Sequence, residues 1–369
     1  MAQYLEGRIN VEYELLDLTS LPSVHAAGKR LRGRFQAIDC AILNAGMGGF
    51  TGIDWPRIVW YTLTDLVQSV TWPTTKRAAI GLVARPQRAP RGPAEETRDP
   101  TANNDKAEPP LGEVFCANVF GHHILTHALM PSLHRSRVPG GARIVWVSSL
   151  EAYARAFSVA DFQSLRTDTA YEGSKRLTDL LTITAGMPEA SPYTTDYFSA
   201  GGGGGGDDEA DARPRDQRPR VYVSHPGICA TGIMPLALPL VWGMVASFYL
   251  ARWFGSIWHT ISAYKGATAP VWLALAPLKA ITAVEKEGDG PGKWGSATDR
   301  QGGERVERTE VEGWGYGGKV GDLSRRKGRM RGAIDSTAES REEFVQLGRE
   351  CWAKIEELRK EWEERLGEA

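Results

Sequence analysis

Two residues on one expected helix have side chains that could exchange a proton with a carbonyl group. Tyr171 and Lys175 stand four positions apart, so they share one face of the helix expected over residues 170–181. A phenol has a pKa of about 10, and a neighbouring ammonium lowers it toward the neutral range. Tyr171 could then act as a general acid. The same spacing also fits an aromatic and a base that merely share a helical face.

The segments around this helix predict an α/β sheet. Strands are expected over 9–18, 38–46, 141–149 and 219–227, with one helix over 113–133 and the Tyr171 helix between the last two strands. Strands that alternate with helices predict a Rossmann-like, doubly wound parallel sheet. Ligands of such sheets bind at the carboxyl ends of the strands.

Three of the expected strands end in small or polar residues that would meet at this edge. They are Asn44-Ala45-Gly46, Ser148-Ser149 and His225-Pro226-Gly227. Glycine at a strand end lets a ligand approach the backbone closely. Ser149 could hold by hydrogen bonding the same carbonyl oxygen that Tyr171 protonates, with Lys175 behind Tyr171.

The order of these motifs resembles the short-chain dehydrogenase/reductase superfamily. The motifs N-A-G, N-x-x-G, S-S, Y-x-x-x-K and P-G-x-x-x-T follow one another, with Asn118 and Gly121 forming the second and Thr231 ending the last. The resemblance implies that Tyr171 is the general acid and that Ser149 donates to the substrate oxygen. It also implies that Lys175 holds the nicotinamide ribose and that Asn118 supports a proton relay.

The resemblance also implies contacts to the cofactor. Asp17 would contact adenine, Asn44, Ala45 and Gly46 would line the adenosine side, and Pro226 and Gly227 through Thr231 would pass along the nicotinamide. The interval from Ser149 to Tyr171 is longer than the superfamily's commonest spacing. The inserted segment 151–169 explains it and leaves Ser148 as an alternative to Ser149.

Further stretches are similar to the fungal 3-keto-steroid reductases of ergosterol synthesis. They include LNAGMGGFTGIDWP, EPPLGEVFCANVFGHH, HPGICAT and TEVEGWGYGG. The resemblance implies that NADPH reduces the 3-ketone of a sterol intermediate during carbon-4 demethylation. Other enzymes of that demethylation would be partners.

One part of the superfamily pattern is missing. No strand with a T-G-x-x-x-G-x-G loop, whose backbone amides would meet the pyrophosphate, precedes segment 9–18. The basic residue that would select NADPH over NADH is missing with it. The sequence therefore predicts a truncated reductase that lacks the first strand-helix-strand portion and binds NADPH weakly or not at all. The alternative is a non-catalytic relative that serves as an interaction protein among sterol-synthesis enzymes.

The remaining sequence predicts one reductase domain over 1–335 and an amphipathic C-terminal helix over 336–369, whose single apolar stripe favours docking on the body of the protein over a coiled coil. Residues 84–112 and 200–218 are rich in Pro and charge or in Gly, and are expected to be solvated insertions. The net charge of −1 argues against a nucleic-acid partner. His123 and His127 form an H-x-x-x-H pair without a metalloprotease Glu or a third ligand, so no metal site is expected.

An apolar run over 233–258 directly follows the P-G-x-x-x-T segment. It has a single charge, Arg252, and several aromatic residues. We expect a substrate lid whose outer face, with Trp242, Phe248 and Trp253, dips into a membrane, with Arg252 reaching lipid phosphate. A buried core helix is the alternative, and prolines at 235 and 239 disfavour a spanning helix. This interpretation places the protein peripherally on the cytosolic face of the endoplasmic reticulum membrane or on a lipid droplet, with the basic cluster 325–331 as a second contact.

Overall fold

The computed structural model describes residues 10–87, 108–199, 218–234, 236–321, 323 and 326–367. The two predicted insertions lie mostly outside these ranges. The described flanks of the first insertion are packed in part, which corrects the expectation for those residues, while Arg85, Pro86 and Pro110 are exposed. Leu111 is buried, and the buried side chain of Gln87 donates to the carbonyl oxygen of Thr19 over 3.1 Å.

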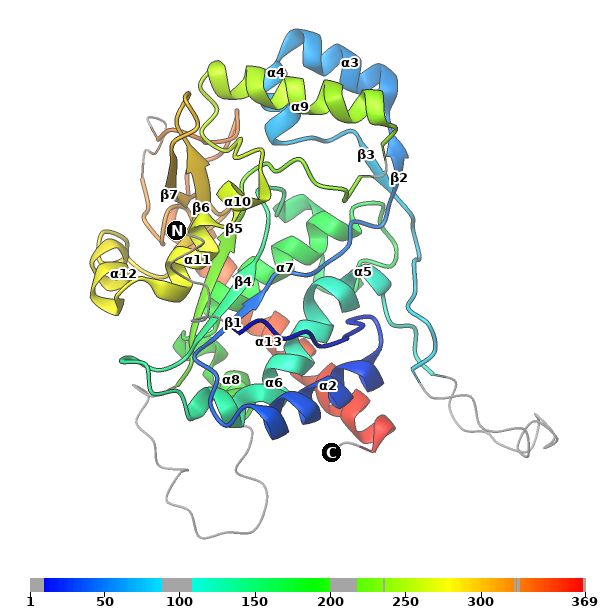
Figure 1. The fold of residues 1–369 in the computed structure, drawn as a ribbon, viewed down its shortest axis with the longest axis vertical. Helices are drawn as coiled ribbons and strands as arrows, with labels where there is room; N and C mark the ends of the chain where they lie inside the picture. The colour runs from blue at the N-terminus through cyan, green and yellow to red at the C-terminus, as the bar shows by residue number, and fades with distance from the viewer. Residues whose placement is uncertain are drawn as a thin grey trace, which may run out of the picture.

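A five-stranded sheet forms the centre of the protein (Figure 1). Its order is β1-β4-β5-β6-β7, and each neighbouring pair is parallel except β6 with β7. The strands are β1 Cys40–Leu43, β4 Arg143–Val147, β5 Arg220–His225, β6 Lys293–Thr298 and β7 Glu304–Thr309. Three of the four strands expected from sequence are therefore present.

Helices cover both faces of this sheet. On one face lie α6 Gly121–His134 and α7 Ala170–Thr184, backed by α2 Leu21–Arg34 and α13 Ala338–Leu366. On the other lie α11 Thr268–Leu275 and α12 Leu278–Glu285. The remaining short segments are α5 Glu113–Phe115, η1 Cys116–Phe120, η2 Ala154–Ala156, η3 Val159–Asp161, η4 Pro188–Ala190, α8 Ser191–Phe198 and α10 Ala263–Gly266. The predicted α/β, doubly wound class is confirmed.

Side chains of the central strands alternate between two apolar cores. Ile144 and Trp146 of β4 pack among the residues of α6, α7 and α13, whereas Val145 packs against α11 and α12. Because both faces of the strand are covered, its sequence is a continuous apolar run without the polar alternation of a half-exposed strand. The docking of α13 predicted from its apolar stripe is confirmed, since Phe344, Cys351 and Ile355 lie in the first of these cores.

The expected strand over 9–18 is wrong for the residues that the structure describes. Residues 10–17 have no regular structure, and Tyr13 and Leu15 are 90% and 91% exposed. The sheet order places β4 on one side of β1, and no described strand lies on its other side. Without a paired backbone a strand has no hydrogen-bond partners. Glu14 instead forms ion pairs with Arg30 and Arg34 of α2.

A second layer lies beyond the carboxyl ends of the parallel strands (Figure 1). It contains the antiparallel pair β2 Phe50–Ile53 and β3 Lys76–Ala78, and three helices, α3 Trp55–Thr64, α4 Leu66–Thr71 and α9 Leu238–Trp253. Asp54 and Asp65 cap the first two helices by accepting from backbone amides of their first turns. We call α3, α4 and α9 the roof helices. No described helix, α9 included, has the length and apolarity needed to cross a bilayer.

Candidate active site

A cavity of about 930 Å³ lies between the carboxyl ends of the strands and the roof helices. Most residues singled out from the sequence line it. They are Asn44, Ala45 and Gly46 after β1, Ser148 and Ser149 after β4, Tyr171 and Lys175 on α7, and Pro226, Gly227 and Thr231 after β5. The structure therefore brings together residues that are up to 187 positions apart, from Asn44 to Thr231. Asp17 and Asn118 do not line this cavity.

Tyr171 lies in the first turn of α7, half-buried, with its side chain in the cavity wall. The inserted segment after β4 packs against this turn. A Cβ on Gly173 would come within 2.6 Å of the Ser164 hydroxyl and 2.7 Å of the Ala156 carbonyl oxygen, so glycine allows the close approach. The insertion thus supports the position of the tyrosine.

Burial, and then the charge of Glu151, raise the pKa of Tyr171 above its ordinary value, although a hydrogen bond with Ser149 lowers it. Tyr171 therefore carries its proton at neutral pH, as a general acid must. The expectation that Lys175 lowers this pKa is not met. Its Nζ atom lies 5.6 Å from the centre of the Tyr171 ring and donates to the carbonyl oxygen of Val147 over 2.9 Å.

Lys175 is buried behind Tyr171, one helical turn further along α7. Burial, and then the charge of Lys293, lower the pKa of Lys175 to about 8, against the opposing charge of Asp179. The ammonium form therefore predominates at neutral pH. Its contact with Val147 fixes it beside the carboxyl end of β4.

The two serines after β4 differ in their hydroxyl partners. Ser148 is buried, and its Oγ donates to Asp179 over 2.6 Å. Ser149 is half-buried, and its Oγ accepts from the backbone amide of Glu151 over 3.2 Å, which leaves its proton available to Tyr171 or to a ligand. This geometry supports Ser149 as the donor to a substrate oxygen.

Asn118 lies in η1, a five-residue π-helix between α5 and α6. Its Oδ1 accepts from the Met47 amide over 2.7 Å, and its Nδ2 donates to the Met47 carbonyl and to Ser174 Oγ, each over 2.9 Å. A Cβ on Gly46 would come within 2.5 Å of Asn118 Oδ1, so glycine is required at this contact. Asn118 thus ties the loop after β1 to α7. Its predicted place in a proton relay stays a prediction.

Asp17 lies outside the cavity, just before α2. Its Oδ1 accepts from the backbone amide and hydroxyl of Thr19, and its own amide donates to Ser23. The carbonyl oxygen of the next residue, Leu18, packs against Gly121, the glycine of the N-x-x-G motif. The structure thus places Asp17 near that motif, and its contact to adenine stays a prediction.

The residues for the nicotinamide half of a dinucleotide fit such a group. Gly227 lines the cavity with a φ of +70°, and a Cβ there would come within 2.4 Å of the Trp258 carbonyl oxygen, so glycine lets the loop after β5 pack closely against that segment. Lys175, Gly46 and Thr231 surround the same space. For the pyrophosphate half, no glycine-rich loop between a strand and a helix precedes β1 in the described part of the chain.

Two charged residues of the cavity were not predicted from the sequence. Lys76 on β3 and Glu151 form an ion pair, and both line the cavity. The Lys76 Nζ atom lies 5.2 Å from the centre of the Tyr171 ring and 4.4 Å from that of Phe50. Glu151 stands two positions after Ser149, separated from it by Leu150, and this nearness could have pointed to it. No local pattern marks Lys76, since β3 is three residues long.

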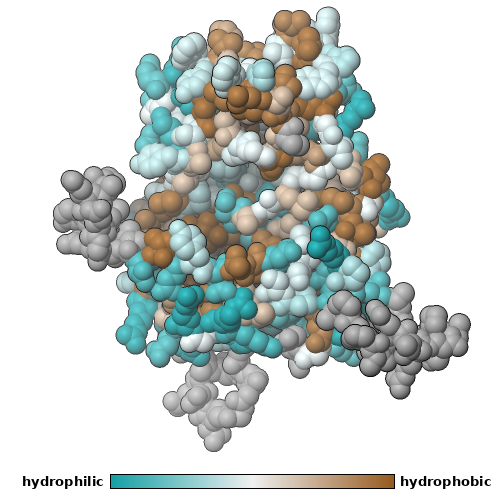
Figure 2. All heavy atoms as spheres, turned by 45° about the vertical axis from the view of Figure 1, so that its right-hand side comes forward, coloured by the Kyte–Doolittle hydropathy of each residue, from teal (hydrophilic) through white to brown (hydrophobic). Residues whose placement is uncertain are grey.

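The end of the cavity beneath the roof helices is apolar. Ile58 and Leu63 of α3, Val70 of α4, and Leu240 and Phe248 of α9 line it. On the side away from the cavity lining, the same helices expose Trp60, Leu238, Trp242 and Trp253. Figure 2 shows brown residues gathered at this end of the molecule.

Two expectations for 233–258 need correction. Phe248 faces inward and is 8% exposed. Arg252 is buried and donates to the carbonyl oxygens of His259 and Thr260, so it is not free to reach lipid phosphate. The Arg252 guanidinium is buried because its three hydrogen bonds to these two carbonyl oxygens replace the water that would otherwise solvate the charge.

Comparison with known proteins decides the family. The chain is 45% identical over 372 aligned residues to the 3-keto-steroid reductase of Aspergillus fumigatus, and the match covers 98% of this chain and 79% of the relative. The chain belongs to the 3-keto-steroid reductase family. The reductase of Gibberella zeae is 39% identical, with 90% of this chain and 69% of the relative covered.

This chain is less similar to solved structures than to these two relatives. No family model matches the chain. An NADPH-bound carbonyl reductase from chicken fatty liver is similar in structure, with a TM-score of 0.36, 15% sequence identity, and 82% of this chain and 81% of that chain covered.

Proposed function

We propose that this protein reduces the 3-keto group of a sterol intermediate to a 3-hydroxyl with NADPH, during carbon-4 demethylation in ergosterol synthesis. One observation carries the proposal. Tyr171 and Ser149 stand together at the polar end of a cavity of about 930 Å³ whose other end is lined by apolar side chains. A rigid, apolar ketone needs the polar end for its oxygen and the apolar end for its ring system. The names of the relatives support the choice of substrate.

The polar end of the cavity would act on the ketone oxygen. Ser149 donates a hydrogen bond to that oxygen, and Tyr171 transfers its phenolic proton to it as the ketone becomes an alcohol. The nicotinamide supplies the hydride when it is bound. Lys175 and Lys76 place positive charge 5.6 Å and 5.2 Å from the centre of the Tyr171 ring, where the phenolate forms.

The apolar end of the cavity would hold the ring system of the sterol. The roof helices α3, α4 and α9 exclude water there and form the boundary between the cavity and the outside. A sterol resides in a bilayer, so an opening through or between these helices would shorten its path. The exposed Trp60, Trp242 and Trp253 support this arrangement, since tryptophan favours the headgroup level of membranes.

This arrangement implies a location. We propose peripheral binding to the cytosolic face of the endoplasmic reticulum membrane or to lipid droplets, through the outer side of the roof helices. Other enzymes of carbon-4 demethylation would then share the same surface and exchange poorly soluble intermediates with this reductase.

The test is a reductase assay on the purified protein with NADPH and a 3-keto sterol in detergent or vesicles. We expect formation of the 3-hydroxy sterol and loss of NADPH fluorescence in equal amounts. NADH in the same assay measures the cofactor preference. Absence of turnover together with absence of NADPH binding would favour the non-catalytic interaction protein over the reductase.

A further inference from the structure

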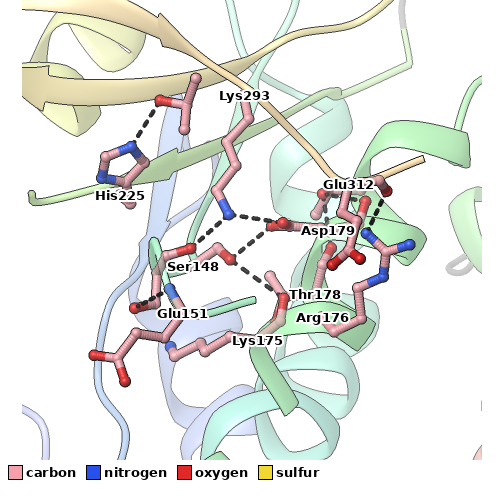
Figure 3. A network of polar contacts seen from close by, with 12 residues as sticks. Ser148, Glu151, Lys175, Arg176, Thr178, Asp179, His225, Lys293 and Glu312 are labelled. Carbon is pink, nitrogen blue, oxygen red and sulfur yellow. Dashed lines mark hydrogen bonds and ion pairs between the residues drawn. The ribbon is translucent and has the colours of Figure 1, made fainter. Parts of the chain in front are cut away.

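A buried ion pair links the sheet to the helix that carries Tyr171. Lys293 begins β6, and Asp179 lies one turn beyond Lys175 on α7. Their side chains are 2% and 1% exposed, and Lys293 Nζ lies 2.6 Å from Asp179 Oδ2. Figure 3 shows the lysine reaching from its strand into the space between Asp179 and the segment after β4.

The pair reaches both serines of that segment, of which Figure 3 labels Ser148. Lys293 Nζ also donates to the backbone carbonyl oxygen of Ser149 over 2.6 Å. The other oxygen of Asp179 accepts from Ser148 Oγ over 2.6 Å. The Ser148 hydroxyl in turn lies 3.2 Å from the carbonyl oxygen of Lys175. Ser148, Ser149, Lys175, Asp179 and Lys293 therefore form one connected set.

Stability alone is a poor reason for such a pair. Moving two charges out of water costs several kcal/mol, and apolar side chains of similar volume often stabilise a protein equally well. An apolar pair, however, has no donor for the Ser149 carbonyl and no acceptor for the Ser148 hydroxyl. What the ions supply here is orientation of the chain between Val147 and Glu151.

We propose that Lys293 and Asp179 are positioning residues of the ketone reduction, which hold the Ser149 backbone and Lys175 in the arrangement that Tyr171 needs. This inference rests on the proposed function. Neither residue lines the cavity, so neither touches the substrate. They act through Ser148 and Ser149.

The pair also sets the charge around Lys175. The charged or titratable groups that bear on Lys175 come from three elements: Lys293 on β6, Asp179 and Tyr171 on α7, and His122 on α6. Lys293 lowers the pKa of Lys175, whereas Asp179 raises it. Removing the Lys293 charge alone should therefore raise the pKa of Lys175.

The test compares Lys293→Met with the double variant Lys293→Met/Asp179→Leu. The single change leaves Asp179 buried without its ion partner, so it should lower the melting temperature; the double change removes both charges and should restore it. We expect kcat to fall about tenfold or more in both variants, with little change in KM. In the single variant, the alkaline limb of the pH profile should also move to higher pH.

A second readout needs no cofactor. The Glu151 amide donates to Ser149 Oγ, so hydrogen exchange in residues 148–152 reports on the position of Ser149. Both variants should exchange faster there. Arg359→Met is the matched control, because it breaks another buried ion pair, with Glu356, on α13. It should lower the melting temperature without faster exchange at 148–152.

Two outcomes would overturn the inference. One is a wild-type kcat in a double variant whose melting temperature is restored, and the other is hydrogen exchange at 148–152 that is unchanged in both variants. These are distinct from failure of the proposed function. That failure would show as no reduction by the unaltered protein, or as full activity in Tyr171→Phe.

Discussion

The ammonium group of Lys76 lies 5.2 Å from the centre of the Tyr171 ring and is ion-paired with Glu151. Lys175 lies at 5.6 Å from the same ring centre. Two cations from different layers of the protein thus approach one phenol, and Glu151 offsets one of them. The neutral phenol is favoured at rest, because burial and the charge of Glu151 outweigh these cations, but both cations remain beside the ring when proton transfer leaves a phenolate.

The first prediction concerns Lys76. Lys76→Met should lower kcat about tenfold, because a desolvated cation near an aromatic ring contributes up to about 2 kcal/mol. Lys76→Arg keeps the charge and should recover most of the rate. Steady-state kinetics of ketone reduction measure both. Equal loss in the two variants would point to packing against Phe50 instead of charge.

The second prediction concerns Tyr171. Tyr171→Phe should reduce turnover about a hundredfold or more, because it removes only the proton donor. Tyr153→Phe is the matched control, since this buried hydroxyl has no hydrogen-bond partner among the described residues and lies outside the cavity lining. Circular dichroism should show both variants folded. Near-normal turnover in Tyr171→Phe would contradict the assignment.

The third prediction concerns Glu172, which is buried next to Tyr171. Burial, and then the charge of Glu151, raise the pKa of Glu172 to about 7 from 4.5. The folded protein therefore binds this proton more tightly than the unfolded chain does, so the free energy of unfolding should fall as pH rises from about 4.5 to about 7. Glu172→Gln stays neutral and should reduce that fall by about 1–3 kcal/mol.

Chemical denaturation at several pH values measures this effect. Glu189→Gln, on the exposed surface, serves as the control and should leave the pH dependence of stability unchanged. Parallel curves for the unaltered protein and Glu172→Gln would show that another group titrates in this range.

The fourth prediction concerns the outer side of the roof helices. Trp60, Trp242 and Trp253 are 64%, 68% and 59% exposed, so replacing all three with Ser removes apolar surface without opening the core. We expect the triple variant to move from the membrane fraction to the soluble fraction. Its KM for a bilayer-embedded sterol should rise more than its KM for a small soluble ketone.

The control for this experiment replaces residues that are as exposed but lie elsewhere. Tyr13 and Ile334 are 90% and 87% exposed, and their replacement with Ser should leave sedimentation with vesicles unchanged. If the triple variant still sediments with vesicles, the membrane contact lies elsewhere, and the basic cluster 325–331 is the next segment to test. The structure describes residues 326–331 of that cluster.

Sequence patterns predicted the centre of the sheet well and its surroundings poorly. β4 and β5 are apolar over residues 144–147 and 221–223 because both faces are covered, so their sequences alone identify them. Segment 9–18 alternates apolar and polar residues as a half-exposed strand does, yet a strand also needs a neighbouring strand, and the segment's own sequence does not show whether one is present.

The same distinction applies to the site. Tyr171, Ser149 and Lys175 could be found because they stand in short motifs at predictable strand ends and on one helical turn. Lys76 and Lys293 could not, because each reaches the site from a different strand through the fold and no local spacing marks it. Phe248 was placed on the outer surface because α9 is apolar all round and its sequence favours no single face.

The hydrogen bond between Lys293 and the Ser149 carbonyl spans 144 positions of the chain. As the polypeptide leaves the ribosome, the segment with Ser149 and Tyr171 is therefore synthesised long before Lys293, which donates this hydrogen bond. Helix α7 and β4 can form early from local contacts, but the serine becomes fixed only when β6 joins the sheet. A nascent chain that stops before Lys293 would carry every residue that touches the ketone and still lack the assembled site.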